Sequence, residues 1–298
     1  MKKNKLLNFV KNPFLLIPSL GFRGFFRWIP DATWLKIIFR IKTGYKLNLK
    51  EPKTFNEKLQ WLKLNDRNPL YTKLVDKFAV RDYVKDSIGE EYLVPLLGVW
   101  DSFDDIDFGK LPDRFVLKCT HDSGGLVICK DKKKLDIPSI KKKICKCMKF
   151  NYYWAFREWP YKDVKPRIVA EEYLEDEKGS LNDYKIFCFN GVAKVWFLIT
   201  GRSSGDTRCD YYDFDGELLP LTQGYPNSGV KRNMPPEVLK MKELAEKLTS
   251  GMKHCRADFY LIGGKIYFGE LTFFDSSGLD RFEPVEWDYK FGNMIDLR

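Results

Sequence analysis

Residues 115–129 read Phe-Val-Leu-Lys-Cys-Thr-His-Asp-Ser-Gly-Gly-Leu-Val-Ile-Cys. The apolar residues at either end predict two strands, 114–118 and 126–129, joined by a loop that holds two glycines. Glycines let backbone N–H groups approach an anion closely, and Lys118 at the strand end supplies a point charge for phosphate. The segment lacks the spacing of a Walker A loop and of a dinucleotide-binding loop. On its own it is either a phosphate site or an ordinary hairpin with an exposed lysine.

Two carboxylates near the C-terminus form a second candidate site. Asp258 and Glu270 fall in strands predicted at 256–262 and 265–274. Carboxylates on adjacent strands can bind Mg²⁺ together with phosphate oxygens. The alternative is that Glu270 is a surface residue of its strand, although its neighbours along the chain are apolar.

The turn between these strands decides whether the two carboxylates share a face. A two-residue turn at 263–264 would pair Asp258 with Gly269 and send Glu270 to the opposite face. A three-residue loop at 262–264, with Gly264 left-handed, shifts the pairing by one residue and puts both carboxylates on one face. We therefore expect the three-residue loop.

The remaining pattern mixes helices with antiparallel hairpins and contains no alternating βαβ series, which predicts an α+β fold. Thr54-Phe-Asn-Glu57 is a capping box that begins a helix ending near Leu64. Asn190-Gly191 suits the type I′ turn of a hairpin. The other predicted elements are helices at 71–85, 132–149 and 236–250, an extended segment at 92–99, and strands at 167–171, 183–189 and 192–199.

Composition excludes several classes of protein. The 298 residues are 44% apolar and 31% charged, which argues against a disordered chain and supplies a sizeable core. Seven cysteines include no CxxC pair, and the only histidines are His121 and His254. These residues do not make a zinc framework or a secreted disulfide scaffold, and they favour a reducing, cytoplasmic compartment.

Positive charge is concentrated in residues 1–50, which carry a net charge of +10, whereas residues 51–298 are balanced. Nine aromatic residues are interleaved with these charges. The longest uncharged stretch, 12–22, is too short to span a membrane, which takes about twenty apolar residues, and no secretory signal is recognisable. The segment fits the surface of an anionic membrane.

Two other interpretations of residues 1–50 stay open. The segment could simply pack a helix on the body of the protein, through Trp34, Leu35, Ile37, Ile38 and Ile41. It could also bind nucleic acid, but we do not expect that partner because the rest of the chain has no basic stripe or nucleic-acid motif.

Three longer motifs resemble one known family. They are Pro52-Lys-Thr-Phe-Asn-Glu-Lys-Leu-Gln-Trp61, Lys118-Cys-Thr-His-Asp-Ser-Gly-Gly125 and Tyr267-Phe-Gly-Glu-Leu-Thr272. With Asp76-Lys77, Ala170-Glu-Glu-Tyr-Leu174, Asp183-Tyr-Lys185 and Arg256-Ala-Asp258, they occur in an order that is similar to the ATP-grasp superfamily. They look most like its TupA-like family, which takes its name from teichuronopeptide synthesis and occurs among bacterial surface-polysaccharide genes. The likeness covers roughly residues 35–290.

The resemblance implies two α+β subdomains that grip ATP between antiparallel sheets. It divides the chain into a helical basic aromatic arm (1–50), a helical or α+β subdomain (51–113), a small subdomain with the phosphate loop (114–182) and a C-terminal subdomain with the metal site (183–298). ATP and Mg²⁺ are the implied cofactors.

The resemblance also implies the residues that hold the nucleotide. Lys77 and Lys118 would bind the phosphates, and the loop Ser123-Gly124-Gly125 would close over them. His121 would be a donor in this loop or a structural hydrogen-bonding residue. The remaining residues implied for the nucleotide site, mostly on the strand that contacts adenine, are Glu171, Glu172, Tyr173, Leu174, Glu175 and Asp183.

Metal and catalytic residues are implied in the same way. Asp258 and Glu270 would bind Mg²⁺, with Thr272 at a position where the superfamily usually has Asn, which leaves a second metal site in doubt. Arg256 would stabilise the oxyanion of an acyl-phosphate or tetrahedral intermediate. The residues implied for the acidic substrate are Lys185, Arg202 and Arg208.

The function we expect from this resemblance is ATP-dependent ligation of a carboxylate to an amine in the synthesis of a bacterial surface polysaccharide. The substrates would be an anionic glycan or uronic acid and an amine such as an amino acid, with the enzyme at the inner face of the membrane. A metal-dependent glycosyltransferase is an alternative, because Asp105-Ile-Asp107 and Asp213-Phe-Asp215 have the required pattern. A sugar or polysaccharide kinase and a non-catalytic membrane-binding protein are the others.

Overall fold

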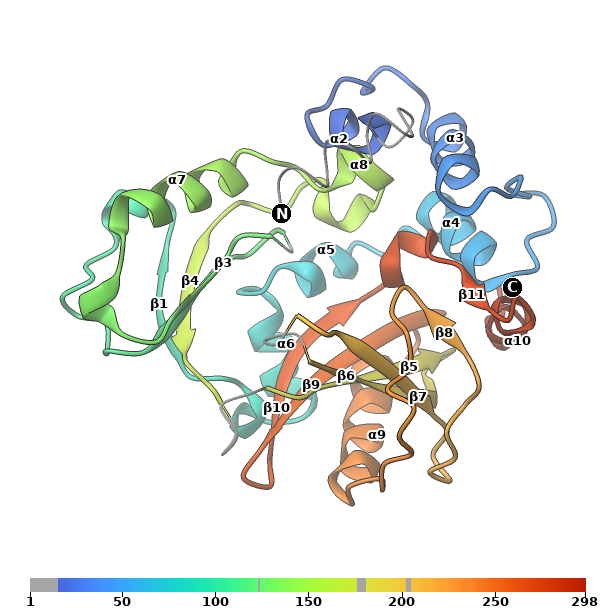
Figure 1. Ribbon diagram of the computed structural model, residues 1–298. Helices are drawn as coiled ribbons and strands as arrows, with labels where there is room; N and C mark the ends of the chain where they lie inside the picture. The colour runs from blue at the N-terminus through green and yellow to red at the C-terminus, as the bar shows by residue number, and fades with distance from the viewer. Residues whose placement is uncertain (1–15, 123, 176–180, 202–204) are drawn as a thin grey trace.

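Two antiparallel sheets carry the fold of the computed structural model, which describes residues 16–122, 124–175, 181–201 and 205–298. The smaller sheet has the strand order β1-β4-β2-β3, and the larger has the order β10-β9-β5-β6-β7. A further pair, β8 and β11, forms a two-stranded sheet. Figure 1 shows the smaller sheet and the larger sheet on opposite sides of the molecule. The expectations for Ser123, Arg202 and residues 1–15 fall outside the described residues.

The strands are β1 (Leu96–Trp100), β2 (Phe115–Cys119), β3 (Leu126–Cys129), β4 (Ile168–Glu172), β5 (Asp183–Phe189), β6 (Val192–Thr200), β7 (Arg208–Tyr212), β8 (Thr222–Gln223), β9 (His254–Ile262), β10 (Lys265–Thr272) and β11 (Phe282–Glu283). The α-helices are α2 (Leu16–Phe22), α3 (Asp31–Thr43), α4 (Phe55–Asn65), α5 (Leu70–Val75), α6 (Val80–Ser87), α7 (Ile137–Met148), α8 (Tyr153–Phe156), α9 (Glu237–Leu248) and α10 (Glu286–Met294). Short 3-10 helices are η2 (Glu90–Tyr92), η3 (Phe103–Asp105), η4 (Lys132–Lys134), η5 (Trp159–Tyr161) and η6 (Asp275–Gly278).

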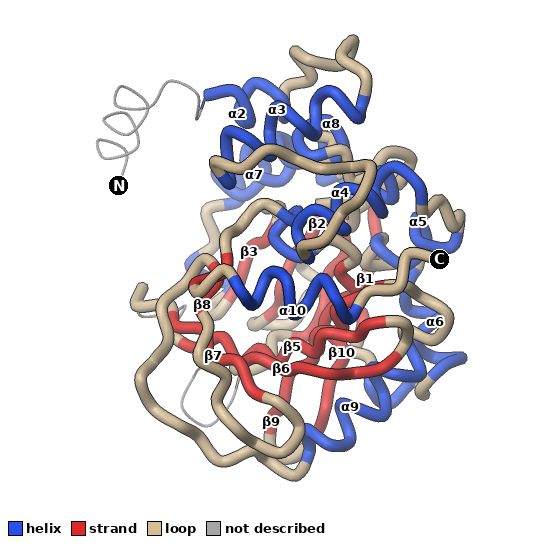
Figure 2. The backbone as a smooth tube through the Cα atoms, turned by 90° about the vertical axis from the view of Figure 1, so that its right-hand side faces the viewer, coloured by secondary structure: helices blue, strands red, loops and turns tan. Residues whose placement is uncertain are grey.

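The larger sheet is buried because helices cover both of its faces. Helix α9 contacts β5, β6 and β9, and Figure 2 shows it below the sheet, while α2, α3 and α8 gather at the other end of the molecule. On the opposite face Phe55 of α4 and Phe291 of α10 pack on Phe187 of β5. Every residue of β5 is buried as a result.

Local signals in the sequence are confirmed at several elements. The capping box at the start of α4 is present, with Glu57 N–H donating to Thr54 Oγ1 at 3.2 Å and Thr54 N–H donating to Glu57 Oε2 at 3.2 Å. Asn190 and Gly191 both have positive φ in the turn of the β5–β6 hairpin, as a type I′ turn requires. Of the helix expected at 132–149, residues 132–134 form η4 and α7 begins at Ile137.

The helix expected at 71–85 is instead broken into α5 and α6. Asp76 ends α5 with an extended backbone, and its carboxylate accepts hydrogen bonds from Phe78 N–H at 2.9 Å and from Arg167 at 2.6 Å. Side-chain bonds of this kind compete with a continuous helix. The break turns Lys77 toward β2, where its N–H donates to Thr120 O at 3.1 Å.

The turn between β9 and β10 also differs from the expectation. It is the two-residue turn, with Gly263 and Gly264 both left-handed and Lys265 paired with Ile262. A β-bulge between Phe268 and Glu270 then shifts the register by one residue. Glu270 therefore pairs with Asp258 after all, through a bulge in the strand and not through a longer loop.

Helix α3 packs on the body of the protein. Trp34, Leu35 and Ile38 are buried in a cluster with Leu279, whereas Ile37 is partly exposed. Trp34 Nε1 donates to Ala155 O at 2.9 Å, and Arg157 Nε lies 2.9 Å from Asp31 Oδ1. Within the described residues, no helix is long and apolar enough to cross a membrane.

Candidate active site

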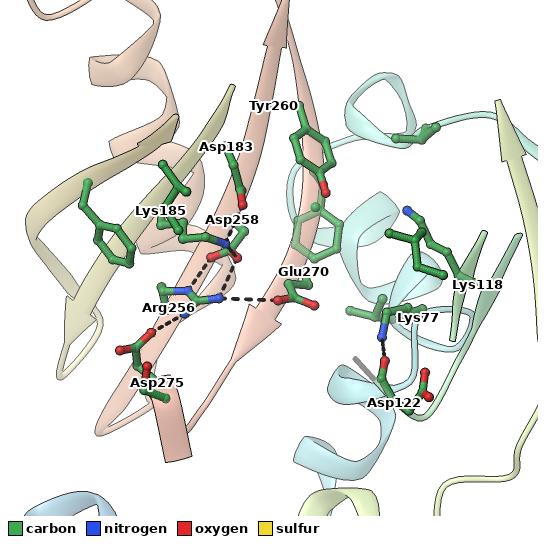
Figure 3. Close-up of a pocket in the computed structure, with 18 of the residues that line it drawn as sticks. Lys77, Lys118, Asp122, Asp183, Lys185, Arg256, Asp258, Tyr260, Glu270 and Asp275 are labelled. Atoms are coloured by element: carbon green, nitrogen blue, oxygen red, sulfur yellow. Dashed lines mark hydrogen bonds and ion pairs between the residues drawn. The ribbon is translucent and has the colours of Figure 1, made fainter. Parts of the chain in front are cut away.

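A cavity of about 420 Å³ lies between the two sheets and collects most of the charged residues singled out from the sequence. Figure 3 shows Lys185, Arg256, Asp258 and Glu270 on one side of it, and Lys77 with Lys118 on the other. The first group stands on β5, β9 and β10. The second group stands on β2 and on the break between α5 and α6. Residues far apart in the sequence thus meet across one cavity.

Arg256 is the centre of an ionic cluster on the larger sheet. Its guanidinium holds Asp258 with two bonds, Nε to Oδ1 at 2.7 Å and Nη2 to Oδ2 at 2.8 Å. Nη1 donates to Asp275, and Nη2 donates to Thr272 Oγ1 at 3.1 Å and lies 3.4 Å from Glu270 Oε1. Such a clamp fixes the plane of the guanidinium in the cavity wall.

Lys185 joins the same cluster from β5, because its position pairs with Asp258 on β9. Its ammonium contacts Asp258 Oδ2 and lies 3.0 Å from Asp183 Oδ2. Burial alone would raise the pKa of Asp258, but the charges of Arg256 and Lys185 lower it below its usual value. Burial raises the pKa of Asp275 despite its contact with Arg256.

Asp258 and Glu270 fit a metal ion whose remaining coordination positions are taken by a bound ligand. Asp258 and Glu270 share one face of the sheet and both line the cavity, but both oxygens of Asp258 already contact cations. Over the described residues, no group of three or more His, Cys, Asp or Glu side chains makes a ready metal site. Mg²⁺ commonly uses one or two carboxylates together with substrate phosphates, so the pair suits that ion once a phosphate is bound.

The opposite side of the cavity supplies two lysines. Lys77 donates from Nζ to the carbonyl of Asp122, and Lys118 Nζ lies 2.5 Å from Glu171 Oε2. Arg81 holds the other oxygen of Glu171 at 3.4 Å. The lysines therefore bind acceptors that an incoming phosphate can replace.

The glycine loop after β2 is shaped by Asp122 and Gly125. Asp122 Oδ1 accepts the Gly125 N–H at 3.0 Å. A Cβ on Gly125 would lie 2.4 Å from Cys119 Sγ and 2.9 Å from Asp122 Oδ1, so only glycine fits. Gly124 is exposed and does not line the cavity.

A second cavity of about 450 Å³ adjoins the first and is mainly apolar. Lys118, Leu126, Glu171, Asp183 and Tyr260 line both cavities. Of the residues assigned to the adenine strand, Glu172, Tyr173 and Leu174 line the second cavity.

Five residues assigned from the sequence lie outside both cavities, including Gly124. His121 is buried with Nε2 3.1 Å from Phe150 O, which is a structural position, and burial lowers its pKa. Glu175 contacts Arg114 and accepts from Tyr173 Oη at 2.9 Å. Arg208 pairs with Asp206 at 2.9 Å. Thr272 reaches the cluster only through Arg256 and Glu270.

The Asp-x-Asp pairs serve local turns. Asp107 accepts the N–H of Gly109 at 2.9 Å. Asp213 Oδ1 accepts the N–H groups of Asp215 at 3.0 Å and Glu217 at 2.8 Å. Neither pair lines a cavity between the sheets.

Sequence reasoning missed three residues of this site. Asp275 holds Arg256 from a turn after β10, Arg81 holds Glu171, and Tyr260 stands between the two cavities. Alternation along β9 places Tyr260 on the face of Asp258 and could have indicated it. Nothing in the local sequence indicates the other two.

The sequence matches the profile of the TupA-like ATPgrasp family over residues 57–296. The chain belongs to the TupA-like ATP-grasp family. The resemblance seen in the sequence, the ATP-grasp fold class and the assignment as an ATP-grasp enzyme are thereby confirmed. No curated protein matches the chain significantly.

Solved structures similar to this ATP-grasp chain include ligases. D-alanine–D-alanine ligase from Bacillus anthracis in complex with ATP is 16% identical, with a TM-score of 0.40 over 67% of this chain and 53% of that chain. The Helicobacter pylori enzyme is 15% identical, with a TM-score of 0.44 over 80% and 66%. D-cycloserine synthetase is 10% identical, with a TM-score of 0.44 over 88% and 78%. The chain spans between half and two thirds of the length of the two D-alanine–D-alanine ligases.

Proposed function

We propose that this ATP-grasp enzyme joins a carboxylate to an amine at the expense of ATP. The observation that supports the proposal best is the Arg256 cluster facing Lys77 and Lys118 across one cavity. Lysines, an arginine and carboxylates suit phosphoryl transfer, where catalysis is mostly positioning and charge stabilisation.

In the proposed reaction, an oxygen of the substrate carboxylate takes the γ-phosphoryl group of ATP and releases ADP. The amine nitrogen then attacks the carbonyl carbon of the acyl phosphate. The bond to the phosphate oxygen breaks, phosphate leaves with the electron pair, and the nitrogen loses a proton. Arg256 would stabilise the oxyanion that develops in this step. Lys77 and Lys118 would hold the transferred phosphates, and the apolar second cavity would receive adenine.

Mg²⁺ is part of the proposal because of the charge on the cavity wall. Among the described lining residues, seven carboxylates outnumber five lysines and arginines. A triphosphate added to this wall would meet net repulsion, which a divalent cation between phosphate and carboxylate offsets. Asp258 and Glu270 would hold the ion, which supplies charge neutralisation when bound.

We further propose a uronic acid of a surface glycan as the carboxylate and an amino acid or other amine as its partner. The resemblance implied that Lys185 binds the acidic substrate. In this proposal Lys185 does not bind it, because its ammonium is already paired with Asp183 and Asp258. Arg208 is paired outside the cavity and takes no part.

Product analysis tests the chemistry directly. Purified protein is incubated with ATP, Mg²⁺, glucuronate and a panel of amino acids, and ADP and phosphate are measured separately. The ligase requires phosphate release that depends on both the acid and the amine. ADP release without phosphate would indicate a kinase and contradict the ligase. Lys118→Ala is the variant expected to lose activity, and Lys110→Ala, an exposed lysine on a loop, is its matched control.

We also propose that residues 1–50 hold the enzyme at an anionic membrane surface. Phe25 and Trp28 are 62% and 79% exposed, and the flanking Arg23 and Arg27 are exposed as well. Aromatic side chains beside cationic ones are typical of interfacial segments. Co-sedimentation with phosphatidylglycerol vesicles should fall in Trp28→Ala and not in Tyr289→Ala, which removes a half-exposed ring from α10. Equal binding by both variants and the wild type would contradict the proposal.

A further inference from the structure

The main cavity continues past Arg256 to a second end, which we call the distal end. Its lining residues are Tyr211, Gln223, Tyr225, Asp275, Ser276 and Asp280. The β8–β11 sheet builds this end, because it pairs Gln223 with Phe282, two residues after Asp280. Asn56 Nδ2 donates to Asp280 O at 2.8 Å and fixes the backbone there.

The distal end is acidic. Asp275 is already held by Arg256, but the Asp280 carboxylate has no hydrogen bond or ion pair with any residue that the structure describes. It lies against Gly224, where a Cβ would come within 3.1 Å of Asp280 Oδ2. Arg281 does not line this cavity, and its guanidinium stacks 5.1 Å from the Tyr45 ring. A partly buried carboxylate without a partner favours a cationic ligand.

Gln223 gives a second and independent indication of a ligand. Its side chain is 5% exposed and lines the same cavity. Oε1 accepts from Tyr211 Oη at 3.0 Å, but Nε2 has no hydrogen-bond partner among the described residues. A buried donor left unpaired is costly, so a ligand oxygen that accepts from it would be favoured.

We propose that the distal end binds the amine substrate, as a protonated amine that carries an acceptor oxygen beside it. This rests on the proposed ligase function. The ammonium lies against Asp280, with Asp275 as the second carboxylate, and the oxygen accepts from Gln223 Nε2. Before the nitrogen attacks the acyl phosphate, the ammonium gives one proton to the Asp280 carboxylate, and the second proton leaves as the amide forms. The half-exposed ring of Tyr225 covers the outer side of the ligand. The same charges repel a uronate from this end, so the acid substrate takes the side of the cavity nearer Arg256 and the lysines.

Calorimetry on protein loaded with a non-hydrolysable ATP analogue and Mg²⁺ tests the inference. The amine probes are D-glucosamine and L-alanine, which distinguish an amino sugar from an amino acid. N-acetyl-D-glucosamine is the uncharged counterpart. We expect at least one amine probe to bind and N-acetyl-D-glucosamine to bind at least tenfold more weakly.

Variants locate the binding. Asp280→Asn should lower the affinity for the amine probe about tenfold, and Gln223→Met should lower this affinity as well. Asp82→Asn is the matched control, because Asp82 is exposed on α6 and does not line the cavity. The inference is overturned if no amine probe binds, if N-acetyl-D-glucosamine binds as tightly as the amine probe, or if Asp280→Asn has no effect. Binding of the ATP analogue is measured in the same samples, so its loss would reject the nucleotide site and not the amine site alone.

Discussion

Glu270 lies opposite Asp258 across strands β10 and β9 because Gly269 is the extra residue of a β-bulge. Without the bulge, the two-residue turn would send the two carboxylates to opposite faces of the sheet. A Cβ on Gly269 would lie 3.1 Å from the carbonyl oxygen of Asp258, so the bulge also depends on a residue without a side chain. One glycine therefore sets the geometry of the candidate Mg²⁺ pair.

Gly269→Val should disturb this pair more than it disturbs the fold. We expect the Mg²⁺-dependent affinity for a non-hydrolysable ATP analogue to fall about tenfold, since a carboxylate displaced from a charged partner loses about 1.5 kcal/mol. Titration calorimetry with and without Mg²⁺ measures it. Gly263→Asn is the control, because that turn position has open space and a left-handed backbone that Asn tolerates. Wild-type Mg²⁺ dependence in Gly269→Val would contradict the account.

The bulge illustrates what the sequence could and could not predict. Local signals such as Thr54 with Glu57 and Asn190-Gly191 determined their elements, because the contacts involved lie within four residues. Asp258 and Glu270 were correctly expected on one face of the sheet. The expected cause was a three-residue loop, whereas the actual cause is a β-bulge. A bulge depends on how the whole strand packs, and a single glycine in a strand does not specify it.

Long-range partners limited the prediction of the site. Arg256 and Glu171 were singled out by their motifs, whereas Asp275 and Arg81 became visible only when the chain folded them against those two residues. The break at Asp76 had the same origin, because its ion pair with Arg167 joins residues 91 apart. Arg208, which the resemblance implied for the acidic substrate, instead pairs with Asp206 outside the cavity.

Two buried charged residues behind the site, Lys63 and Glu158, should stabilise the turn that presents Asp275, because both contact Ser277. Lys63 Nζ donates to Ser277 O at 2.7 Å, and the Ser277 hydroxyl donates to Glu158. Ser276 and Ser277 are both left-handed, so this turn needs support. Removing one charge leaves the other buried, and we expect Lys63→Met to lower the free energy of unfolding by about 3–5 kcal/mol.

A double-mutant cycle in urea checks this coupling. The double variant Lys63→Met with Glu158→Gln should lose clearly less free energy of unfolding than the two single variants lose in sum. The second substitution removes the charge that the first one leaves buried without a partner. Additive losses would show that the two residues act independently.

His254 should make the fold sensitive to acid. Burial lowers its pKa to about 3, compared with about 6.5 in an unfolded chain. As pH falls below 6.5, His254 binds a proton in the unfolded state but not in the folded state. The free energy of unfolding therefore decreases by about 1.4 kcal/mol per pH unit, down to the pKa of the folded state. His254→Asn keeps a donor for Cys188 O, which His254 Nδ1 contacts at 2.9 Å, and does not titrate.

Urea unfolding between pH 7 and pH 4.5 measures the difference. The wild type should lose about 2.5 kcal/mol more than His254→Asn over this range. Parallel pH profiles would mean that His254 is protonated in the folded protein or that another group dominates.

Nucleotide binding at the cavity between the sheets is the central claim, and calorimetry with a non-hydrolysable ATP analogue and Mg²⁺ tests it most directly. The wild type and Lys110→Ala should bind with micromolar affinity, and Lys118→Ala should bind at least tenfold more weakly, because it loses a charged contact to phosphate. UDP-sugars are titrated beside the analogue. Clear binding of a UDP-sugar together with no binding of the ATP analogue would contradict the claim.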